Sequence, residues 1–249
     1  MYFVRDKTPE GVLSACKQFC ADFAHELRQN GGKITRWHTD NGGEFTSASL
    51  DEFCANLAVR RSFSVPHLPS QNAIAERAWG TILRPMRVLL AASGMPESFW
   101  NFAMHHAVYV HNRLPTRGLT PLMSPYHKLY GRMPDLGSLR VWGCLCFVRL
   151  EKSQRAQPST KVSPLGVQAV HVGMDPRRKA YFAYIPSLGR VASVYHITFN
   201  ERRFIPVRML SQEEVPKEPP RVSIRASEPP MQCAPVSYTH LTLPTRLPG

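Results

Sequence analysis

Two acidic residues stand in contexts that suit phosphoryl-transfer chemistry. Asp40 lies in HTDNGGEF (38–45), directly after an apolar, β-favouring run and before an Asn-Gly-Gly turn. Glu76 lies in PSQNAIAER (69–77), with 35 residues between the two acids, and falls in the first turn of an expected helix. Carboxylate oxygens suit Mg²⁺ or Mn²⁺, and two such ions can drive in-line displacement at phosphorus. From spacing alone, two unrelated surface acids remain the alternative.

The helix that carries Glu76 is predicted to have two distinct faces. Its apolar residues fall on the side away from Glu76 at 100° per residue: Ile74, Ala78, Ile82, Met86 and Leu89. Gly80, Arg84 and Arg87 fall within about 80° of Glu76. The spacing therefore predicts an exposed, arginine-bearing face around the acid, with a glycine that lets another backbone approach.

Residues 1–130 are predicted to form an α/β region. The chain opens on a short strand-like run, and two more apolar runs predict strands at 33–40 and 59–65. Apolar residues at spacings of three and four predict four helices, at 8–32, 47–57, 73–92 and 96–112. Thr8 can cap the first helix, and Gly31-Gly32 can end it. Alternating strands and helices indicate layers built on a sheet.

Beyond Gly131 the pattern changes to short apolar-aromatic runs separated by turn residues. These runs predict a small all-β module of four or five strands within 138–205, in the segments 139–150, 166–174, 179–186 and 190–199. Residues 206–235 are rich in Pro, Glu, Ser and Arg and predict a disordered linker. Residues 236–249 fit neither module. PVSYTHLTLPTR resembles a translated sequencing-library adapter, so we interpret this tail as an adapter-derived artefact.

The charge balance indicates a polyanionic partner. The 249 residues hold 31 Lys and Arg against 18 Asp and Glu, a net charge of +13, with a pI near 9.8. Nucleic acid is the first expectation and a membrane surface the second. The six cysteines form no CxxC pair, so they are expected to be small core residues in a reducing compartment. We expect a soluble intracellular protein, because no apolar run is long enough to cross a membrane.

Several motifs, in order along the chain, resemble copia-type retrotransposon integrases. They are HTDNGGEF, PSQNAIAER, SFWNFAMHHAVYVHNRLP, TPLMSPYHKLYGRMPDLGSLRVWGCLCFV and HVGMDPRRKAYFAYIP, and they extend over roughly residues 1–205. The resemblance implies a DDE-type polynucleotidyl transferase and a fragment of a Gag-Pol-type polyprotein. The implied fold is an incomplete RNase H-like integrase core followed by a small SH3-like all-β module.

The resemblance also implies roles for individual residues. Asp40 and Glu76 would be catalytic and would hold Mg²⁺ or Mn²⁺, in a two-ion site in the intact parent. The residues expected to contact nucleic acid are Gln71, Asn72, Arg77, Arg84 and Arg87. The expected partners are element ends and target DNA, with homo-oligomers in the parent and no membrane. The expected location is the nucleus, or a cytoplasmic particle before nuclear entry.

The chain also departs from the family pattern. The family's first catalytic Asp belongs to a strand upstream of the matching segment, and we expect that strand and its partner to be missing here. Asp6 is a poor replacement, because it aligns with a turn. Pro85 lies within the Glu76 helix, where a proline costs about 3 kcal/mol or more and predicts a kink or an end.

Two functional hypotheses therefore remain from the sequence. The first is an integrase segment that performs 3′-end processing and strand transfer in the intact parent. The second is a non-catalytic, degenerate remnant that binds nucleic acid at most non-specifically. We expect no catalysis from this chain alone. The run 177–179 is interpreted first as a solvated hairpin turn. Together with Arg60, Arg61 and Arg140 it could instead extend a phosphate-binding surface.

Overall fold

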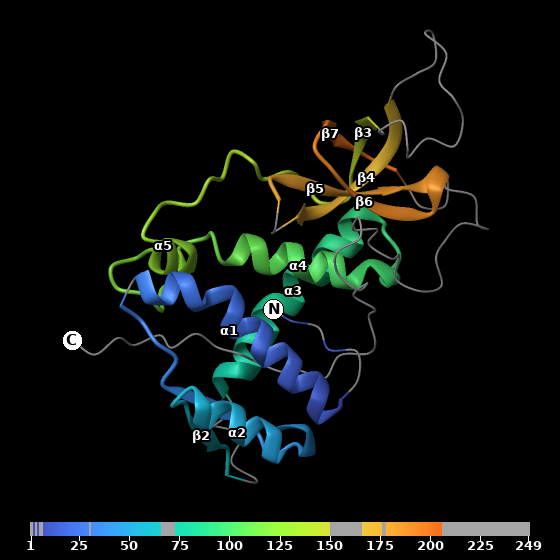
Figure 1. Cartoon of the computed structure of the whole chain (residues 1–249). Helices are drawn as coiled ribbons and strands as arrows, with labels where there is room; N and C mark the ends of the chain where they lie inside the picture. Colours follow the sequence, from blue (N-terminus) through green and yellow to red (C-terminus); the bar gives the residue numbers. More distant parts are fainter. Residues whose placement is uncertain are drawn as a thin grey trace. The chain divides into compact units, whose positions relative to one another are not determined.

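The computed structural model describes residues 2, 4, 7–29, 31–65, 73–149, 166–175 and 178–205 (Figure 1). The described residues divide into two compact units. The first takes its residues from Met1–Thr81 and His111–Asp135, and the second from Ile82–Val110 and Leu136–Gln232. The boundary at Thr81 falls within one helix, α3. The predicted domain boundaries themselves stay predictions, and residues 206–249 lie outside the described part.

Helix α1 (Pro9–Gln29) opens the first unit. Its start matches the sequence prediction, since the backbone N–H of Gly11 donates to Thr8 Oγ1 at 3.1 Å. Gly31 follows its end at a φ of +64°, a left-handed conformation that glycine adopts without strain. The apolar stripe of α1 buries Val12, Cys16 and Phe19. Side-chain periodicity therefore fixes both the helix and the face that it buries.

Two short parallel strands form the sheet of the first unit. Strand β1 (Arg36–Thr39) pairs with β2 (Arg60–Phe63), in register from Arg36 opposite Arg60 to Thr39 opposite Phe63. Between them lie the 3₁₀ turn η1 (Gly43–Phe45) and helix α2 (Ala48–Asn56). A parallel pair needs such a crossover, and here the crossover is helical.

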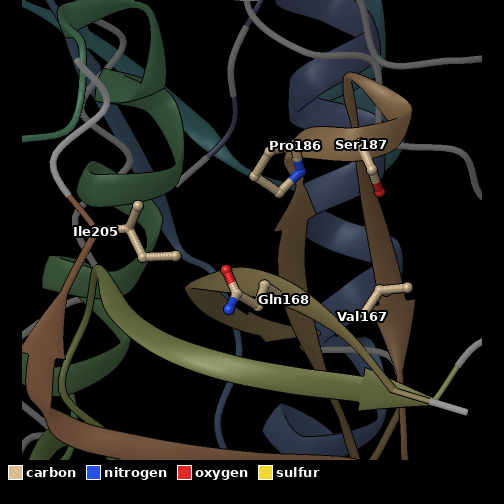
Figure 2. A pocket seen from close by; sticks show the side chains of 5 residues that line it. All are labelled: Val167, Gln168, Pro186, Ser187 and Ile205. Carbon is tan, nitrogen blue, oxygen red and sulfur yellow. The ribbon is translucent and has the colours of Figure 1, made fainter. Parts of the chain in front are cut away.

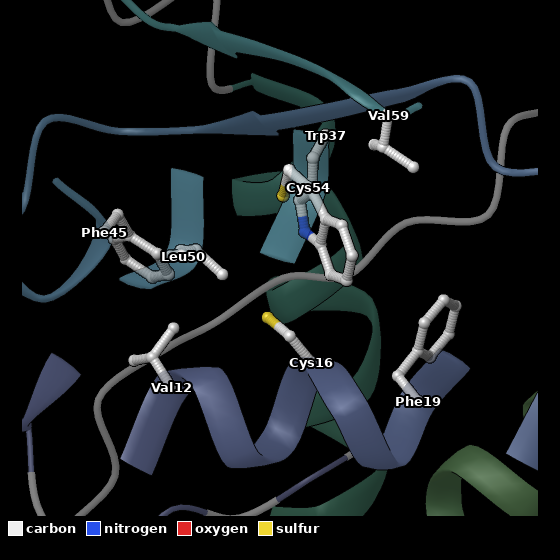
Figure 3. Close-up of a cluster of buried hydrophobic side chains, with 8 residues drawn as sticks. All are labelled: Val12, Cys16, Phe19, Trp37, Phe45, Leu50, Cys54 and Val59. Atoms are coloured by element: carbon white, nitrogen blue, oxygen red, sulfur yellow. The ribbon is translucent and has the colours of Figure 1, made fainter. Parts of the chain in front are cut away.

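One apolar cluster joins these elements (Figure 3). Trp37 of β1 faces α1, while Leu50 and Cys54 come from α2. The full cluster comprises Val12, Cys16, Phe19, Trp37, Phe45, Leu50, Cys54 and Val59. Phe19 meets Trp37 edge-on, with ring centroids 6.2 Å apart. The buried Trp37 thus anchors the strand whose end carries Asp40.

The first unit also contains a short helix that the sequence did not predict, α5 (Pro125–Tyr130). Ser124 caps it by accepting the backbone N–H of His127 at 3.1 Å, and Gly131 ends it at a φ of +66°. Six residues are too few for periodicity to reveal, so the Ser-Pro start and the glycine stop were the available signals.

Helix α3 (Ala73–Ser93) runs without interruption through Pro85. Of the two outcomes predicted for this proline, a kink or an end, the end is wrong. Beyond Gly94 the chain continues through η3 (Glu97–Phe99) into α4 (Trp100–His111), as predicted for 96–112. Most of the first two turns of α4 is buried, including Phe102, Ala103, Met104 and His106.

Five antiparallel strands make the β-module of the second unit. They are β3 (Cys144–Arg149), β4 (Gly166–Asp175), β5 (Ala180–Ile185), β6 (Arg190–Val194) and β7 (Ile197–Phe204), in the order β6-β5-β4-β3-β7. The apolar run 190–199 supplies two strands, not one. One cluster fills the interior: Cys146, Val148, Ala169, Ala183, Ile185, Ala192 and Val194. The predicted fold class, an α/β region followed by a small all-β module, is confirmed.

The β-module packs against helical residues of its own unit. Phe99 is fully buried and lies edge-on to Tyr184, with ring centroids 4.9 Å apart, and Phe102 meets Phe182 at 6.2 Å. Leading into β3, Trp142 Nε1 donates to the Val172 carbonyl at 2.9 Å. These contacts join the β-module to helical residues of the same unit.

Candidate nucleic-acid interface and carboxylate site

Asp40 lies where the sequence predicted it, directly after β1, and its side chain is exposed. The turn behind it is held by hydrogen bonds between the strand ends. Asn41 Nδ2 donates to the Ser64 carbonyl at 2.7 Å, and the Ser64 N–H donates to the Thr39 carbonyl at 2.9 Å. Asp40 therefore projects from a rigid strand end and not from a free loop.

A second carboxylate lies beside Asp40. The backbone N–H of Gly42 donates to Asp40 Oδ1 at 3.1 Å. A Cβ at position 42 would lie 2.8 Å from Glu44 Oε2 and 3.2 Å from Asp40 Oδ1, so both acids flank the same glycine. Glu44 was not among the site residues predicted from the sequence. The Gly-Gly-Glu sequence after Asn41 could have indicated it, because a tight turn there brings positions 40 and 44 together.

Glu76 is exposed in the first turn of α3. Arg77, Arg84 and Arg87 are exposed along the same helix, whereas Ile82 and Met86 on the opposite side are buried. The predicted division of the helix into two faces is thus observed. The roles of these residues stay predictions.

The arginines of α3 differ in what they contact. Arg77 Nε donates to the Ala73 carbonyl at 3.1 Å, one turn earlier. Within the described part of the chain, neither Arg84 nor Arg87 forms a hydrogen bond or an ion pair. Their guanidinium groups are therefore available to an anion, apart from any interaction with residues that the structure does not describe.

The described residues contain no group of three or more His, Cys, Asp and Glu side chains that could hold a metal ion. Asp40 and Glu76 both offer exposed carboxylate oxygens, a donor type that fits Mg²⁺ or Mn²⁺. Three residues named from the sequence, Asp6, Gln71 and Asn72, lie outside the described residues.

Two arginines expected on the phosphate-binding surface have structural roles. Arg61 Nη1 forms an ion pair with Asp51 at 2.6 Å, and Arg61 Nη2 donates to the Phe45 carbonyl. The Arg61 side chain is only 9% exposed. Arg140 Nη1 donates to the carbonyls of Gly137 and Leu139, at 2.7 and 2.6 Å. Burial contradicts the expected phosphate contact of Arg61, whereas that of Arg140, whose side chain is 33% exposed, stays a prediction.

Two buried histidines stabilise the second unit. The nitrogens of His171 lie 3.1 Å from two carbonyl oxygens, Nδ1 from Val141 and Nε2 from Gly173. Its ring lies edge-on to His106 of α4, with centroids 5.8 Å apart. Burial lowers the pKa of His171 to about 4, and burial together with the nearby His171 lowers the pKa of His106 to about 4. Both imidazoles are therefore neutral at pH 7.

The described cysteines are core residues, as predicted. All five are free thiols, and Cys16, Cys54, Cys144 and Cys146 are buried. Burial raises the pKa of Cys16 to about 12 and that of Cys144 to about 11. Such thiols stay protonated at neutral pH, so they are poor nucleophiles and poor metal ligands.

Comparison with known proteins decides the family. The sequence model of the retroviral polymerase SH3-like domain matches residues 144–213. The Pol polyprotein from transposon RE1 of Arabidopsis thaliana is 32% identical over 216 residues, 87% of this chain. This chain is related to retrovirus-related Pol polyproteins. The relationship to retrotransposon Pol polyproteins that the sequence motifs indicated is confirmed.

Other transposon Pol polyproteins are similarly related. That from TNT 1-94 of Nicotiana tabacum is 30% identical over 197 residues, 78% of this chain, and that from RE2 of Arabidopsis thaliana is 33% identical over 172 residues, 69% of it. The matched region is only 14% of the RE1 polyprotein, 14% of the TNT 1-94 polyprotein and 11% of the RE2 polyprotein. The chain therefore spans a small part of each relative.

Retroviral integrases are among the solved structures with partial similarity. The catalytic core domain of BIV integrase is 18% identical, covers 51% of this chain and 74% of its own, and gives a TM-score of 0.38. For a chain of the simian T-cell lymphotropic virus intasome the identity is 15% and the TM-score is 0.40; the match covers 70% of this chain and 58% of that chain.

Within the described residues, no helix is both long and apolar enough to cross a membrane.

Proposed function

We propose that this chain is the integrase-related part of a retrotransposon Pol polyprotein and that it binds DNA through the exposed face of α3. The observation that carries the proposal is the grouping of Arg77, Arg84 and Arg87 on one exposed side of a single helix. At 1.5 Å per residue they extend over about 15 Å of helix axis, enough to reach several phosphates. The net charge of +13 supports a polyanionic partner.

Binding of this kind recognises the backbone of DNA and not its sequence. Arginines on a helix surface neutralise phosphates, and Gly80 in the same face leaves room for a close approach. Among the described residues, no acidic side chain forms an ion pair with Arg84 or Arg87, so both positive charges are available to phosphates. Affinity is therefore expected to depend steeply on salt and weakly on base sequence.

A second candidate function, metal-dependent phosphoryl transfer, is favoured by the exposed carboxylates at the end of β1 and the start of α3. In the intact polyprotein, Asp40 and Glu76 would hold Mg²⁺ or Mn²⁺, and such ions would stabilise charge on the attacking and leaving oxygens. The arginines of α3 would hold the DNA backbone near Glu76. We propose homo-oligomers of the parent as the assembly and the nucleus as the place of action.

The binding proposal is tested by salt titrations on several unrelated duplexes of equal length. Arg84→Glu combined with Arg87→Glu should weaken binding to every duplex alike, by at least tenfold at low salt. The matched control is Lys7→Glu combined with Lys33→Glu, which makes the same change in net charge at exposed residues outside α3. An equal loss in both double variants would mean that net charge, and not the face of α3, controls binding.

The catalytic candidate has a separate test. The purified chain is assayed for Mg²⁺-dependent strand transfer with matched element ends, alongside Asp40→Asn and Glu76→Gln. Activity that both substitutions abolish, with DNA affinity unchanged, supports the two carboxylates as catalytic. Absence of activity in the unsubstituted chain, with binding intact, supports the non-catalytic alternative for this chain.

A further inference from the structure

Two arginines lie directly opposite each other on the two strands of the first unit. Arg36 of β1 is in register with Arg60 of β2. The backbone N–H of Arg60 donates to the Thr35 carbonyl at 3.0 Å, so a hydrogen bond between the strands holds the two positions side by side. Neighbouring strands lie about 4.8 Å apart, and two positively charged side chains leave the backbone at that separation.

Both side chains point away from the apolar core of the unit. Side chains alternate along a strand, and the next pair in register, Trp37 and Arg61, faces inward. Trp37 is buried in the core (Figure 3), and Arg61 is paired with Asp51 of α2. Arg36 and Arg60 therefore share the opposite face, and both are exposed.

The following pair on this face is polar. His38 Nδ1 lies 3.0 Å from Ser62 Oγ, so side chains two residues beyond the arginines also meet across the strands. His38 Nε2 forms no hydrogen bond within the described residues, and its α-carbon is about 7 Å along the strand from that of Arg36. Asp40 lies two residues further on, about 13 Å from Arg36, which is too far for an ion pair.

The two positive charges are not neutralised by the described part of the chain. Neither guanidinium group forms an ion pair or a hydrogen bond there. Like charges directly opposite on neighbouring strands repel and weaken the pairing. An anion between them would remove the repulsion and accept charge-assisted hydrogen bonds from both guanidinium groups. Phosphate fits better than a carboxylate, whose two oxygens can be taken up by a single guanidinium group.

The pocket on the β-module has the opposite chemistry (Figure 2). Its lining contains no charged residue: Val167, Gln168, Pro186, Ser187 and Ile205. A phosphate group would find no cation there, whereas the exposed face of β1 and β2 offers two.

We propose that Arg36 and Arg60 together bind one phosphate group on the exposed face of the β1–β2 pair, with His38 beside it. The sequence indicated Arg60 as a phosphate contact, and the strand register adds Arg36 as its partner. The phosphate is either free or part of a nucleic-acid backbone. The proposal does not rest on DNA binding by α3, because no residue of α3 takes part.

The first arm of the test uses inorganic phosphate against chloride at equal ionic strength, with the full chain. Phosphate at about ten times its dissociation constant should raise the melting temperature of the first unit by about 4 °C or more. The Nε–H signals of Arg36 and Arg60 should shift together along one binding curve. Arg36→Gln and Arg60→Gln should each abolish the response. In chloride alone each should melt about 1–2 °C higher than the unsubstituted chain, because the repulsion is gone.

The matched control is Lys7→Gln, which removes one exposed positive charge outside the strand pair and should keep the full phosphate response. A response that survives in both arginine variants would be a general salt effect and would overturn the proposal. Arginine signals that do not move with phosphate would overturn it as well.

The second arm distinguishes the two sources of phosphate. A short DNA duplex is titrated at several salt concentrations with the unsubstituted chain and with Arg60→Gln. A slope of log K against log salt that is about 0.9 less steep in the variant assigns the site to a nucleic-acid backbone. An unchanged slope, with the response to inorganic phosphate intact in the unsubstituted chain, assigns it to free phosphate. Arg84 and Arg87 are present in every variant, so a failure here is distinct from a failure of the α3 interface.

Discussion

The two apolar cores of this protein are built in different ways. The core of the first unit combines α1, one strand, a 3₁₀ turn and α2, and among its described residues β1 pairs with β2. In the β-module, β3–β4, β4–β5 and β5–β6 are neighbours in both chain and sheet and pair antiparallel, with one shift of register between His171 and Gly173. The first core depends on helix packing, and the second depends on antiparallel pairing between strands.

The polar residues also differ between the β-module and the elements that carry the candidate site. In the β-module and the segment before it, polar groups stabilise the fold: Trp142, His171, Tyr181 and Arg140 all bond to backbone carbonyls. At the end of β1 and along α3, Asp40, Glu76 and the arginines are exposed. Positive charge alone therefore does not locate an interface. Arg84 differs from Arg61 in being exposed and in forming no hydrogen bond or ion pair with the described residues.

The largest expected effect comes from removing a buried contact between a helical residue and the β-module. Phe99→Ala should destabilise the second unit by about 3–5 kcal/mol, because a fully buried ring in contact with Tyr184 is lost. Phe147→Ala, at a side chain that is 41% exposed, should cost less than about 1 kcal/mol. Urea unfolding followed by the amide signals of β4 checks both. Equal costs would show that the β-module is independent of the helical residues.

The next effect concerns the entry to β3. Gly143 has a φ of +79°, and a Cβ there would lie 2.2 Å from Ser93 Cβ. Gly143→Ala should cost about 2–4 kcal/mol, from backbone strain and overpacking together. Gly166→Ala is the matched control, since its Cβ would meet only the Val148 carbonyl at 3.9 Å. Thermal melts of the two variants that coincide would contradict the close approach of α3 to this turn.

A smaller effect concerns pH: the stability of the second unit should depend on pH more strongly than that of the first. The folded pKa values of His106 and His171 are about 4, below the ordinary 6.5. Their contribution to stability is therefore complete above pH 6.5 and is lost as the pH falls towards 4, because the unfolded chain takes up protons first. Between pH 7 and pH 5 the second unit should lose on the order of 2 kcal/mol.

The pH effect has an internal control. His25 and His38, in the first unit, are exposed, so that unit should lose less stability over the same range. His106→Leu should reduce the pH dependence of the second unit. Unfolding free energies measured by urea titration at pH 7, 6 and 5 test this. A second unit that is equally stable at all three pH values would rule out neutral buried histidines.

Local sequence signals predicted much of the fold. The apolar stripe Val12-Cys16-Phe19 predicted α1, Thr8 predicted its start, and the helical period placed Glu76 and Arg84 on an exposed face. The missed features depend on distant partners. Arg61 forms an ion pair with Asp51 of α2. Position 143 favours glycine because a side chain there would collide with Ser93 of α3. No local pattern contains that information.

The central claim is that the arginine face of α3 binds phosphates, and the salt dependence of DNA binding tests it most directly. Each arginine that neutralises one phosphate contributes about −0.9 to the slope of log K against log salt concentration. The triple variant Arg77→Ala, Arg84→Ala and Arg87→Ala should therefore bind with a slope about 2.7 less steep than the unsubstituted chain, with folding unchanged. A triple variant that keeps the original slope would contradict the account.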